Sequence, residues 1–236
     1  MVSIVTGTLN RLEILKQVIN NTVLKSDKLE LVLVDGGSTD GTIEYLKTLN
    51  HPSIKLIEVG GRSSYPHFMN LGINNAKYEW VCQWNDDVVL INNWEEVFSE
   101  ISDENDFYLF NWKYGNLSDI NSEIWLEGLD YTKGWCLLDQ VNNGGEIVMN
   151  YGLYNKKIFR EIGMYNNQYQ YYYADGDMAY RANKFGYKHK SLYNIKVCSL
   201  ITNKNAIQHG GDSTIYNNNL SLYEQGKLPE NIEFLI

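Results

Sequence analysis

The stretch that decides the fold is Tyr78–Leu90, YEWVCQWNDDVVL. Its first part, Trp80–Trp84, is a short and mostly apolar run of the bulky residues that favour β-strands. Asn85-Asp86-Asp87 interrupts this run before apolar residues resume. Carboxylates at the end of a buried strand are costly unless a partner neutralises them, and the hard oxygens suit Mg²⁺ or Mn²⁺. An acidic turn explains the same residues, so both interpretations stay open at this point.

Strand and helix patterns alternate through the first half of the chain. Strands are predicted at Val2–Thr8, Leu29–Val34 and Ile54–Val59. Helices are predicted after them, over Leu12–Val23, Ile43–Leu49 and Tyr65–Asn75. Asn10 is predicted to cap the first helix, because Glu13 completes a capping-box pattern. This alternation indicates right-handed βαβ units, so we predict one Rossmann-like α/β domain with a mostly parallel central sheet flanked by helices.

The loops at the strand ends are the expected ligand-binding positions, because open α/β sheets bind ligands at the carboxyl ends of their strands. Asp35 stands at such an end and could accept hydrogen bonds from a base or ribose, while Gly36 lets a ligand approach the backbone. An Asx-turn that leads into a helix explains the same loop, and the two interpretations are compatible. A dinucleotide fingerprint needs three glycines after the first strand, but Thr6–Asn10 contains one, and no P-loop pattern is present.

Composition limits the classes of function. The chain has 236 residues and a formal net charge of -9, whereas a general nucleic-acid binder needs a basic face. The three cysteines, Cys82, Cys136 and Cys198, are widely spaced and odd in number, which argues against a disulfide framework or a zinc knuckle. No apolar run approaches the roughly 20 residues that cross a bilayer, and the N-terminus lacks the basic region of a signal peptide. We therefore expect a soluble, cytoplasmic protein without a transmembrane segment.

Several segments resemble, in their order, those of the family 2 glycosyltransferases, which have the GT-A fold. The segments of the first half are VSIVTGTLNR (2–11), LVLVDGGSTDGT (31–42) and MNLGINNAKYEWVCQWNDDV (69–88). Those of the second half are YGLYNKKIF (151–159) with GMY (163–165), YYYADGDMAYRANKFG (171–186) and QHGGDS (208–213). The resemblance covers residues 1–215 and implies a GT-A domain with a nucleotide-sugar-binding half, residues 1–90, and an acceptor-side half, residues 91–215.

The resemblance also implies roles for single residues. Asn85-Asp86-Asp87 takes the place of the DxD motif, so Asp87 is expected to bind the Mn²⁺ or Mg²⁺ ion that holds the diphosphate. His209 is a second metal or phosphate contact in this interpretation, and an ordinary surface or core histidine in the alternative. The expected nucleotide contacts are Thr6, Thr8, Asn10, Arg11, Asp35, Gly36, Arg62, Asn70, Asn85 and Asp86.

Asp175 matches the acid that acts as general base in inverting members of the family. Asp177, two residues further on, is a candidate second acid, which we interpret as a helix cap or a supporting residue. Three positions depart from the family pattern. Asn85 replaces the first acid of the DxD motif, Ala174 replaces a glutamate before Asp175, and Met69 replaces an arginine for which Arg62 could substitute.

The middle and the end of the chain are the least informative. Residues 111–145 are rich in aromatic side chains, which form either core or a platform for the acceptor sugar. Acceptor contacts are predicted at Trp135, Gly144 and Gly145. The tail, residues 216–236, is predicted to form a helix and an extended segment that packs on the domain or on a partner subunit, so a homodimer stays open.

We therefore predict a metal-dependent glycosyltransferase that moves a sugar from a nucleotide-diphosphate sugar to a hydroxyl of a carbohydrate or glycoconjugate, with inversion. UDP is the first choice of nucleotide, followed by GDP and dTDP. The alternative is a catalytically inactive glycosyltransferase fold that binds a sugar or a protein, which Asn85 and Ala174 favour. A pyrophosphorylase of related fold fits less well, because no glycine-rich loop with an arginine follows the first strand.

Overall fold

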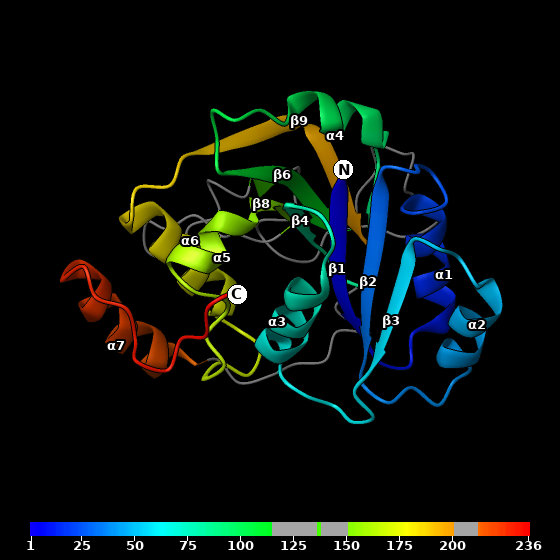
Figure 1. Cartoon of the computed structure of the whole chain (residues 1–236), viewed down its shortest axis with the longest axis horizontal. Coiled ribbons are helices and arrows are strands. Elements are labelled where there is room, and N and C mark those ends of the chain that lie inside the picture. The colour runs from blue at the N-terminus through cyan, green and yellow to red at the C-terminus, as the bar shows by residue number, and fades with distance from the viewer. Residues whose placement is uncertain (115–135, 138–150, 201–211) are drawn as a thin grey trace.

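The computed structural model describes residues 1–114, 136–137, 151–200 and 212–236 (Figure 1). The strands are β1 (Val2–Thr8), β2 (Leu29–Asp35), β3 (Ile54–Glu58), β4 (Trp80–Gln83), β5 (Val88–Leu90), β6 (Phe107–Tyr114), β7 (Cys136–Leu137), β8 (Gly152–Asn155) and β9 (His189–Ser199). The helices are α1 (Leu12–Asn21), α2 (Thr42–Leu49), α3 (Tyr65–Asn75), α4 (Trp94–Glu100), α5 (Lys156–Glu161), α6 (Ala174–Lys184) and α7 (Ser213–Glu224).

The strands of the described residues form one sheet in the order β3-β2-β1-β4-β8-β6-β9-β5, with β7 beside β6. The first four in this order, β3 to β4, are parallel to one another. β8 lies antiparallel between β4 and β6, whereas β9 is parallel to β6 and antiparallel to β5. The predicted fold class, a single α/β domain with a mostly parallel central sheet, is confirmed, and antiparallel pairs are added in the second half.

Register brings the ends of three strands to one edge of the sheet. Thr8, the last residue of β1, is aligned with Asp35, the last residue of β2. Gln83, the last residue of β4, is aligned with Val5 of β1. The loops that follow these strands therefore lie at the same edge, which is where an α/β sheet presents a ligand site.

Helices cover both sides of the parallel part of the sheet. Figure 1 shows α3 on one side of β1–β3, and α1 and α2 on the other. Val2, Ile4 and Val5 of β1 are fully buried, as are Leu31–Val34 of β2. Such continuous burial explains why these strands are apolar along their whole length instead of alternating.

The start of α1 corrects one prediction. Asn10 does not cap this helix, which begins at Leu12, and its own backbone is left-handed with φ 54°. The backbone N–H of Leu12 donates instead to Asp40 Oδ2 at 3.0 Å. Glu13 does not complete a capping box and forms an ion pair with Lys16. A carboxylate from the second loop therefore takes over the capping role that the local pattern assigned to Asn10.

The tail packs on the body of the domain. The N–H of Leu235 donates to the carbonyl of Phe159, and the N–H of Met164 donates to the carbonyl of Glu233. Gly163 has φ 83°, and a Cβ there would lie 1.9 Å from Ile232 Cγ2, so glycine is required on both counts. In the described part of the chain, no helix combines the length and apolarity needed to cross a membrane.

Candidate active site

The acidic loop between β4 and β5 is held tightly against β1. The indole Nε1 of Trp84 donates to the carbonyl of Val88 at 2.8 Å, which spans the loop from one end to the other. The backbone N–H of Trp84 donates to the carbonyl of Val5 at 2.9 Å. Trp84 is fully buried, so its ring anchors the loop in the core. Asp86 and Asp87 are thereby fixed at the edge where the parallel strands end.

Asp86 is a buried carboxylate with two contacts from the first loop. Thr8 Oγ1 donates to its Oδ2 at 2.7 Å, and Arg11 Nε lies 3.8 Å from the same oxygen. Burial, together with the neighbouring charge of Asp87, raises the pKa of Asp86 to about 7, although Arg11 and Thr8 oppose the shift. Its surroundings therefore supply less positive charge than an ionised carboxylate needs.

The carboxylate of Asp87 has fewer partners than that of Asp86. Ser199 Oγ donates to its Oδ2 at 3.2 Å, but its Oδ1 is buried and has no hydrogen-bond partner in the part of the chain that the structure describes. Burial raises the pKa of this carboxyl as well, against the opposing effects of Arg11 and Ser199. A buried carboxylate oxygen without a partner is costly, so such an atom marks a place for a ligand.

These two carboxylates fit a divalent cation. Both carry raised pKa values, and Arg11 is the only cationic side chain among the described residues that the structure pairs with either of them. A bound Mn²⁺ or Mg²⁺ would supply the missing charge through hard oxygen ligands. Among the described residues no group of three or more acidic, histidine or cysteine side chains could hold a metal by itself. His209, the predicted second ligand, lies outside the described residues.

Asn85 is held by a residue that the sequence did not single out. Its Nδ2 donates to the hydroxyl of Tyr151 at 3.0 Å. Tyr151 has φ 54°, a left-handed conformation that is strained for a non-glycine residue, and its N–H donates to Gln83 Oε1. A pattern of apolar and polar residues carries no signal for such a backbone conformation, so Tyr151 could not be found from the sequence.

The loops after β1 and β2 are bonded to each other. Asn10 N donates to Ser38 Oγ at 2.9 Å, and Asn10 Oδ1 accepts the N–H of Thr39 at 2.7 Å. The N–H of Gly36 donates to the carbonyl of Thr8 at 2.9 Å. Three of the predicted nucleotide contacts, Thr8, Asn10 and Gly36, are therefore brought together, and Thr6 lies fully buried just before them.

Asp35 forms the turn that its sequence allows. Its Oδ1 accepts the N–H groups of Gly37 and Ser38, each at 2.8 Å, and its Oδ2 accepts the Ser38 hydroxyl at 2.6 Å. The residue is fully buried, so its carboxylate organises the loop from inside. A direct contact between Asp35 and a base stays a prediction.

Arg62 and Asn70 differ in what they offer a ligand. The guanidinium of Arg62 is 5.5 Å from the centre of the Tyr171 ring, on the surface. Asn70 is buried, and both ends of its amide bond the backbone of Tyr165, at 2.7 and 3.0 Å. The structure thus gives Asn70 a structural contact, and its nucleotide contact stays a prediction.

Asp175 is partly buried in the first turn of α6. Its Oδ1 accepts the N–H of Gly176 at 2.9 Å. Burial raises the pKa of its carboxyl, with this hydrogen bond opposing the shift. A carboxylate with a raised pKa is a better proton acceptor. Tyr173, at the entry to the helix, has φ 69°, so a second strained aromatic residue borders a predicted site residue.

Asp177 has a structural role, and the prediction that it caps α6 is wrong, because it lies inside the helix. It is fully buried, and a role as supporting residue or second acid stays a prediction. Its Oδ2 accepts Arg181 Nε at 3.0 Å, while Oδ1 accepts the hydroxyls of Tyr169 and Tyr223 and Asn219 Nδ2. The residues Asn219 and Tyr223 belong to α7, so this network ties α7 to α6.

A sequence model of Glycosyl transferase family 2 matches residues 3–198. The chain belongs to this family. Family membership agrees with the arrangement just described, in which the loops at the strand ends converge on an acidic pair. A comparison of this glycosyltransferase domain with curated protein sequences found no match.

Solved structures similar to this glycosyltransferase domain show the same fold. One is the mannosyltransferase PcManGT from Pyrobaculum calidifontis in complex with GDP-Man and Mn²⁺, with a TM-score of 0.59 and 15% identity over 86% of this chain. Another is S. aureus TarS 1-349 in complex with UDP-GlcNAc, with a TM-score of 0.64 and 15% identity over 88% of this chain. The present domain spans 58% of the first structure and 61% of the second.

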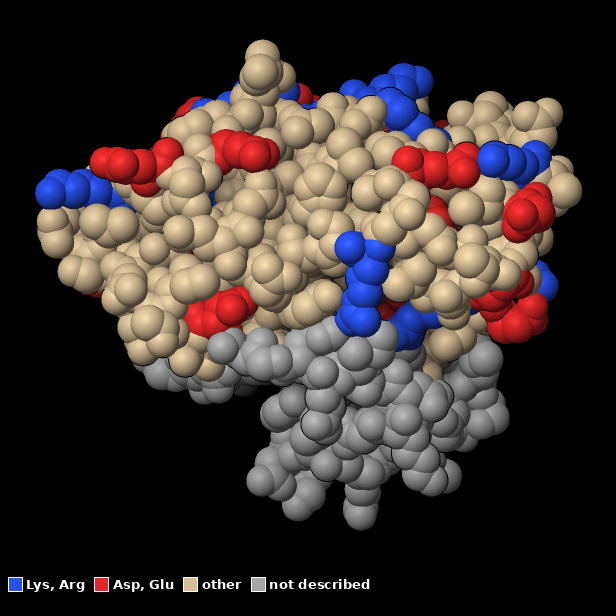
Figure 2. Space-filling view, turned by 90° about the horizontal axis from the view of Figure 1, so that it is seen from below, with Lys and Arg blue, Asp and Glu red and all other residues tan. Residues whose placement is uncertain are grey.

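The charge on the site side of this family 2 domain is mixed. Figure 1 shows β1–β3 running towards its lower edge, and Figure 2 looks onto the molecule from that direction. Acidic and basic side chains are interspersed there on a largely uncharged surface, with no continuous basic patch among the residues drawn in colour.

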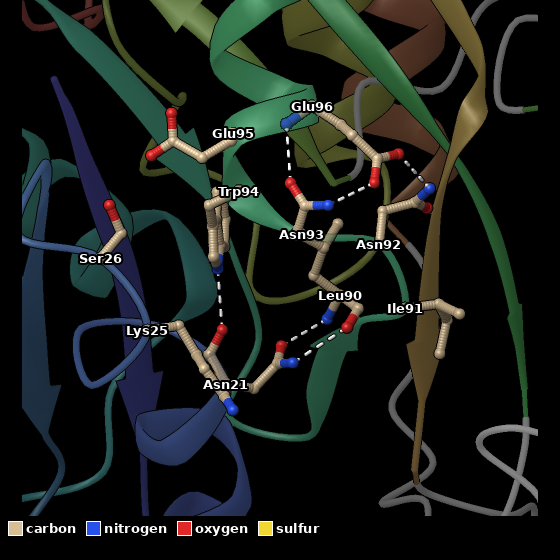
Figure 3. A pocket seen from close by; sticks show the side chains of 10 residues that line it. All are labelled: Asn21, Lys25, Ser26, Leu90, Ile91, Asn92, Asn93, Trp94, Glu95 and Glu96. Atoms are coloured by element: carbon tan, nitrogen blue, oxygen red, sulfur yellow. Dashed lines mark hydrogen bonds between the residues drawn. The ribbon is translucent and has the colours of Figure 1, made fainter.

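A pocket of about 710 Å³ lies between the end of α1 and the start of α4 (Figure 3). Two of its side chains bond backbone groups across the pocket: the Asn21 amide bonds both backbone groups of Leu90, and Trp94 Nε1 donates to the backbone carbonyl of Asn21. No predicted site residue lines it. The predicted acceptor residues Trp135, Gly144 and Gly145 lie outside the described residues.

Proposed function

We propose that this family 2 domain transfers a sugar from a nucleotide-diphosphate sugar to a hydroxyl acceptor with the help of a divalent cation. The observation that carries the proposal is the acidic pair, Asp86 and Asp87, with its raised pKa values and with an Asp87 Oδ1 that has no partner among the described residues. Two structures of the same fold support it, since one was solved with GDP-Man and Mn²⁺ and another with UDP-GlcNAc.

Each residue then has a distinct task. Asp87, with Asp86 beside it, would hold the cation, which neutralises charge on the leaving diphosphate. The loops after β1 and β2, which are hydrogen-bonded to each other, would hold the nucleotide, with Thr8, Asn10 and Arg11 at their centre. UDP is our first choice, and GDP and dTDP are the alternatives.

Asp175 is proposed as the general base of an inverting reaction. The acceptor oxygen forms a bond to the anomeric carbon as its proton passes to the Asp175 carboxylate. The bond from the anomeric carbon to the diphosphate breaks, and its electron pair leaves with the diphosphate. The burial that raises the pKa of Asp175 makes its carboxylate more basic, which favours this proton transfer.

A calorimetric titration with UDP, GDP and dTDP, with and without Mn²⁺, tests the proposal directly. We expect one nucleotide to bind more tightly when Mn²⁺ is present. The absence of binding to all three, under both conditions, would refute the proposal.

Replacement of Asp175 tests the assignment of the base. Asp175→Asn should lower kcat by about 10²–10⁴-fold while donor affinity stays nearly unchanged, because the base acts only as the acceptor attacks. Asp103→Asn, at an exposed aspartate, is the matched control and should leave both values unchanged. An Asp175 variant that retains full turnover would exclude this residue as the base.

A non-catalytic binding domain is the second candidate. Asn85 carries no charge, and its amide donates to the Tyr151 hydroxyl. Ala174 is fully buried at the position where the family pattern has a glutamate. The two candidates differ in donor hydrolysis. A transferase releases nucleoside diphosphate slowly from its donor in the absence of acceptor, whereas a binding domain releases none.

A further inference from the structure

Tyr151 has a backbone conformation that is costly for its residue type. Its φ of 54° lies in the left-handed region, which a glycine would adopt without strain. Strain of this kind persists only where the surrounding structure enforces it, and it is concentrated at functional sites. The tyrosine side chain at this position therefore needs an explanation that its backbone does not supply.

The surroundings of Tyr151 hold its backbone at both ends. Its N–H donates to Gln83 Oε1 at 3.0 Å, and its carbonyl accepts the N–H of Phe110 at 3.1 Å. The next residue, Gly152, lies so close to β6 that a Cβ there would be 2.2 Å from the carbonyl oxygen of Tyr108. The strained residue is therefore fixed against two strands, β4 and β6, and its ring is buried.

The side chain of Tyr151 reaches the start of the acidic loop. Its hydroxyl accepts Asn85 Nδ2 at 3.0 Å, while its backbone N–H bonds the side chain of Gln83. Gln83 and Asn85 stand immediately before and after Trp84, the residue that anchors this loop in the core. We call these two hydrogen bonds the Tyr151 clamp, because they fix the chain on both sides of Trp84.

Asn85 begins the turn that carries the acidic pair. Its carbonyl accepts the N–H of Val88 at 3.2 Å, which makes Asn85–Val88 a four-residue turn. Asp86 and Asp87 are the two central residues of this turn. The placement of both carboxylates therefore depends on where Asn85 is held.

The hydroxyl of Tyr151 is not needed merely to satisfy the amide of Asn85. Asn85 is only partly buried, so water could bond its Nδ2 in place of the tyrosine. Phenylalanine would fill the same space as the tyrosine ring. What the hydroxyl adds is a partner whose own position is fixed, so the direction of the Asn85 side chain becomes fixed as well.

We propose that Tyr151 is a positioning residue that sets the affinity of Asp86 and Asp87 for a divalent cation by clamping Asn85 at the start of their turn. Tyr151 acts through Asn85 and the turn. The inference deepens the proposed function and rests on it for the nature of the ligand, a divalent cation. Groups that orient metal ligands from behind are worth about 10–100-fold in metal affinity.

A double-mutant cycle tests this role, with Mn²⁺ alone as the probe. The electron paramagnetic resonance signal of unbound Mn²⁺ measures its affinity for the parent, Tyr151→Phe, Asn85→Ala and the double variant. We expect each single change to weaken binding by about 10-fold. The double variant should bind no more weakly than the weaker single variant, because the hydroxyl acts only through Asn85.

Two results of the cycle would overturn the proposal. One is an unchanged Mn²⁺ affinity of Tyr151→Phe. The other is a double variant in which the two losses multiply, since the two residues would then act independently. If Tyr151→Phe fails to fold, Asn85→Ala breaks the same hydrogen bond from the other side, and the parent affinity in that variant would also contradict the proposal.

Tyr108→Phe is the matched control. Tyr108 is fully buried, and its hydroxyl bonds the backbone N–H and carbonyl of Ser102. Both Tyr→Phe changes should lower the melting temperature by about 2–4 °C, but only Tyr151→Phe should weaken Mn²⁺ binding. Equal losses of Mn²⁺ affinity in the two variants would reflect general destabilisation, and the proposal would be wrong.

The same titration separates this inference from the proposed function. A parent protein that binds no Mn²⁺ would refute the metal-assisted function, and the role of Tyr151 with it. A parent that binds Mn²⁺ no more tightly than Tyr151→Phe would refute the role of Tyr151 alone.

Discussion

Asp177 and Asp87 are both buried carboxylates, but their surroundings differ. Asp177 accepts hydrogen bonds from four side chains, including the guanidinium of Arg181. Asp87 receives one bond from Ser199, and its other oxygen has no partner in the described part of the chain. Burying a charge is costly unless partners are complete. The comparison therefore separates a carboxylate whose partners are complete from one that the described residues leave incompletely paired.

The largest effect should come from disrupting the hydrogen bonds of Asp177. Arg181→Met removes the partner of Asp177 and the donor to three backbone carbonyls. We expect the free energy of unfolding to fall by about 3–5 kcal/mol, measured by urea denaturation, because an uncompensated buried charge is left behind.

Arg160→Met is its control. Arg160 pairs with Glu79 on the surface, so its loss should cost no more than about 1 kcal/mol. If both arginine variants lost the same free energy of unfolding, the Asp177 network would be no more stabilising than an ordinary surface ion pair.

Replacement of Asp87 should have the opposite effect on stability. Asp87→Asn deletes a charge that burial penalises, so without metal the melting temperature should stay unchanged or rise. Asp177→Asn should lower it. In the presence of Mn²⁺, nucleotide affinity of Asp87→Asn should fall by about 100-fold, since even residues that only support a metal ligand are worth about 10–100-fold. Calorimetry with and without EDTA measures this, and unchanged affinity would contradict the role of Asp87.

Stability should depend on pH through Asp86. Burial raises the pKa of its carboxyl to about 7, against about 3.9 in an unfolded chain. The folded state thus favours the protonated form, so this contribution to stability is complete below pH 4 and is lost as the pH rises through 7. Without metal, we expect a larger free energy of unfolding at pH 5 than at pH 8.

Asp86→Asn removes that contribution, while Asp87 and Asp175, whose pKa values are also raised, still contribute to the slope. The variant should lose part of the difference between pH 5 and pH 8, and Asp103→Asn should retain all of it. Identical slopes in the parent and the Asp86 variant would show that Asp86 is adequately compensated in the fold.

The smallest effect concerns the Ser199 hydroxyl, which donates a hydrogen bond to Asp87. Ser199→Ala should lower the free energy of unfolding by about 1 kcal/mol at pH 8. The loss should become smaller as the pH falls through the raised pKa of the Asp87 carboxyl, because protonation removes the charge that the hydroxyl stabilises. Denaturation curves over a series of pH values measure this difference, and a loss that grows as the pH falls would reverse our interpretation of the bond.

The sequence predicted the parts of the fold that depend on local pattern. The strand pattern at Val2–Thr8 and the helix pattern at Tyr65–Asn75 gave the bounds of β1 and α3. The end of the strand pattern before Asn85 placed Asp86 and Asp87 after β4, at the edge where the parallel strands end. Such features follow from the periodicity of neighbouring residues, which tertiary packing here reinforces.

The missed contacts join residues that are far apart in the chain. Ser199 is 112 positions from Asp87, and Asp40 is 28 positions from the Leu12 amide that it caps. No local pattern encodes such pairs. The Asp177 network is an intermediate case: Arg181 stands four residues later on the same helix, a spacing typical of ion pairs, whereas Tyr223 and Asn219 come from α7.

The bonds that join the loops after β1 and β2 have a consequence for the thermodynamics of binding. Asn10 is tied to Ser38 and Thr39, and Leu12 to Asp40, so the two loops share one hydrogen-bonded framework before any ligand arrives. A flexible loop loses conformational entropy when a ligand orders it, and that loss weakens affinity. A ligand that settles between these two loops meets backbone that is already ordered, so more of its contact energy is expressed as affinity.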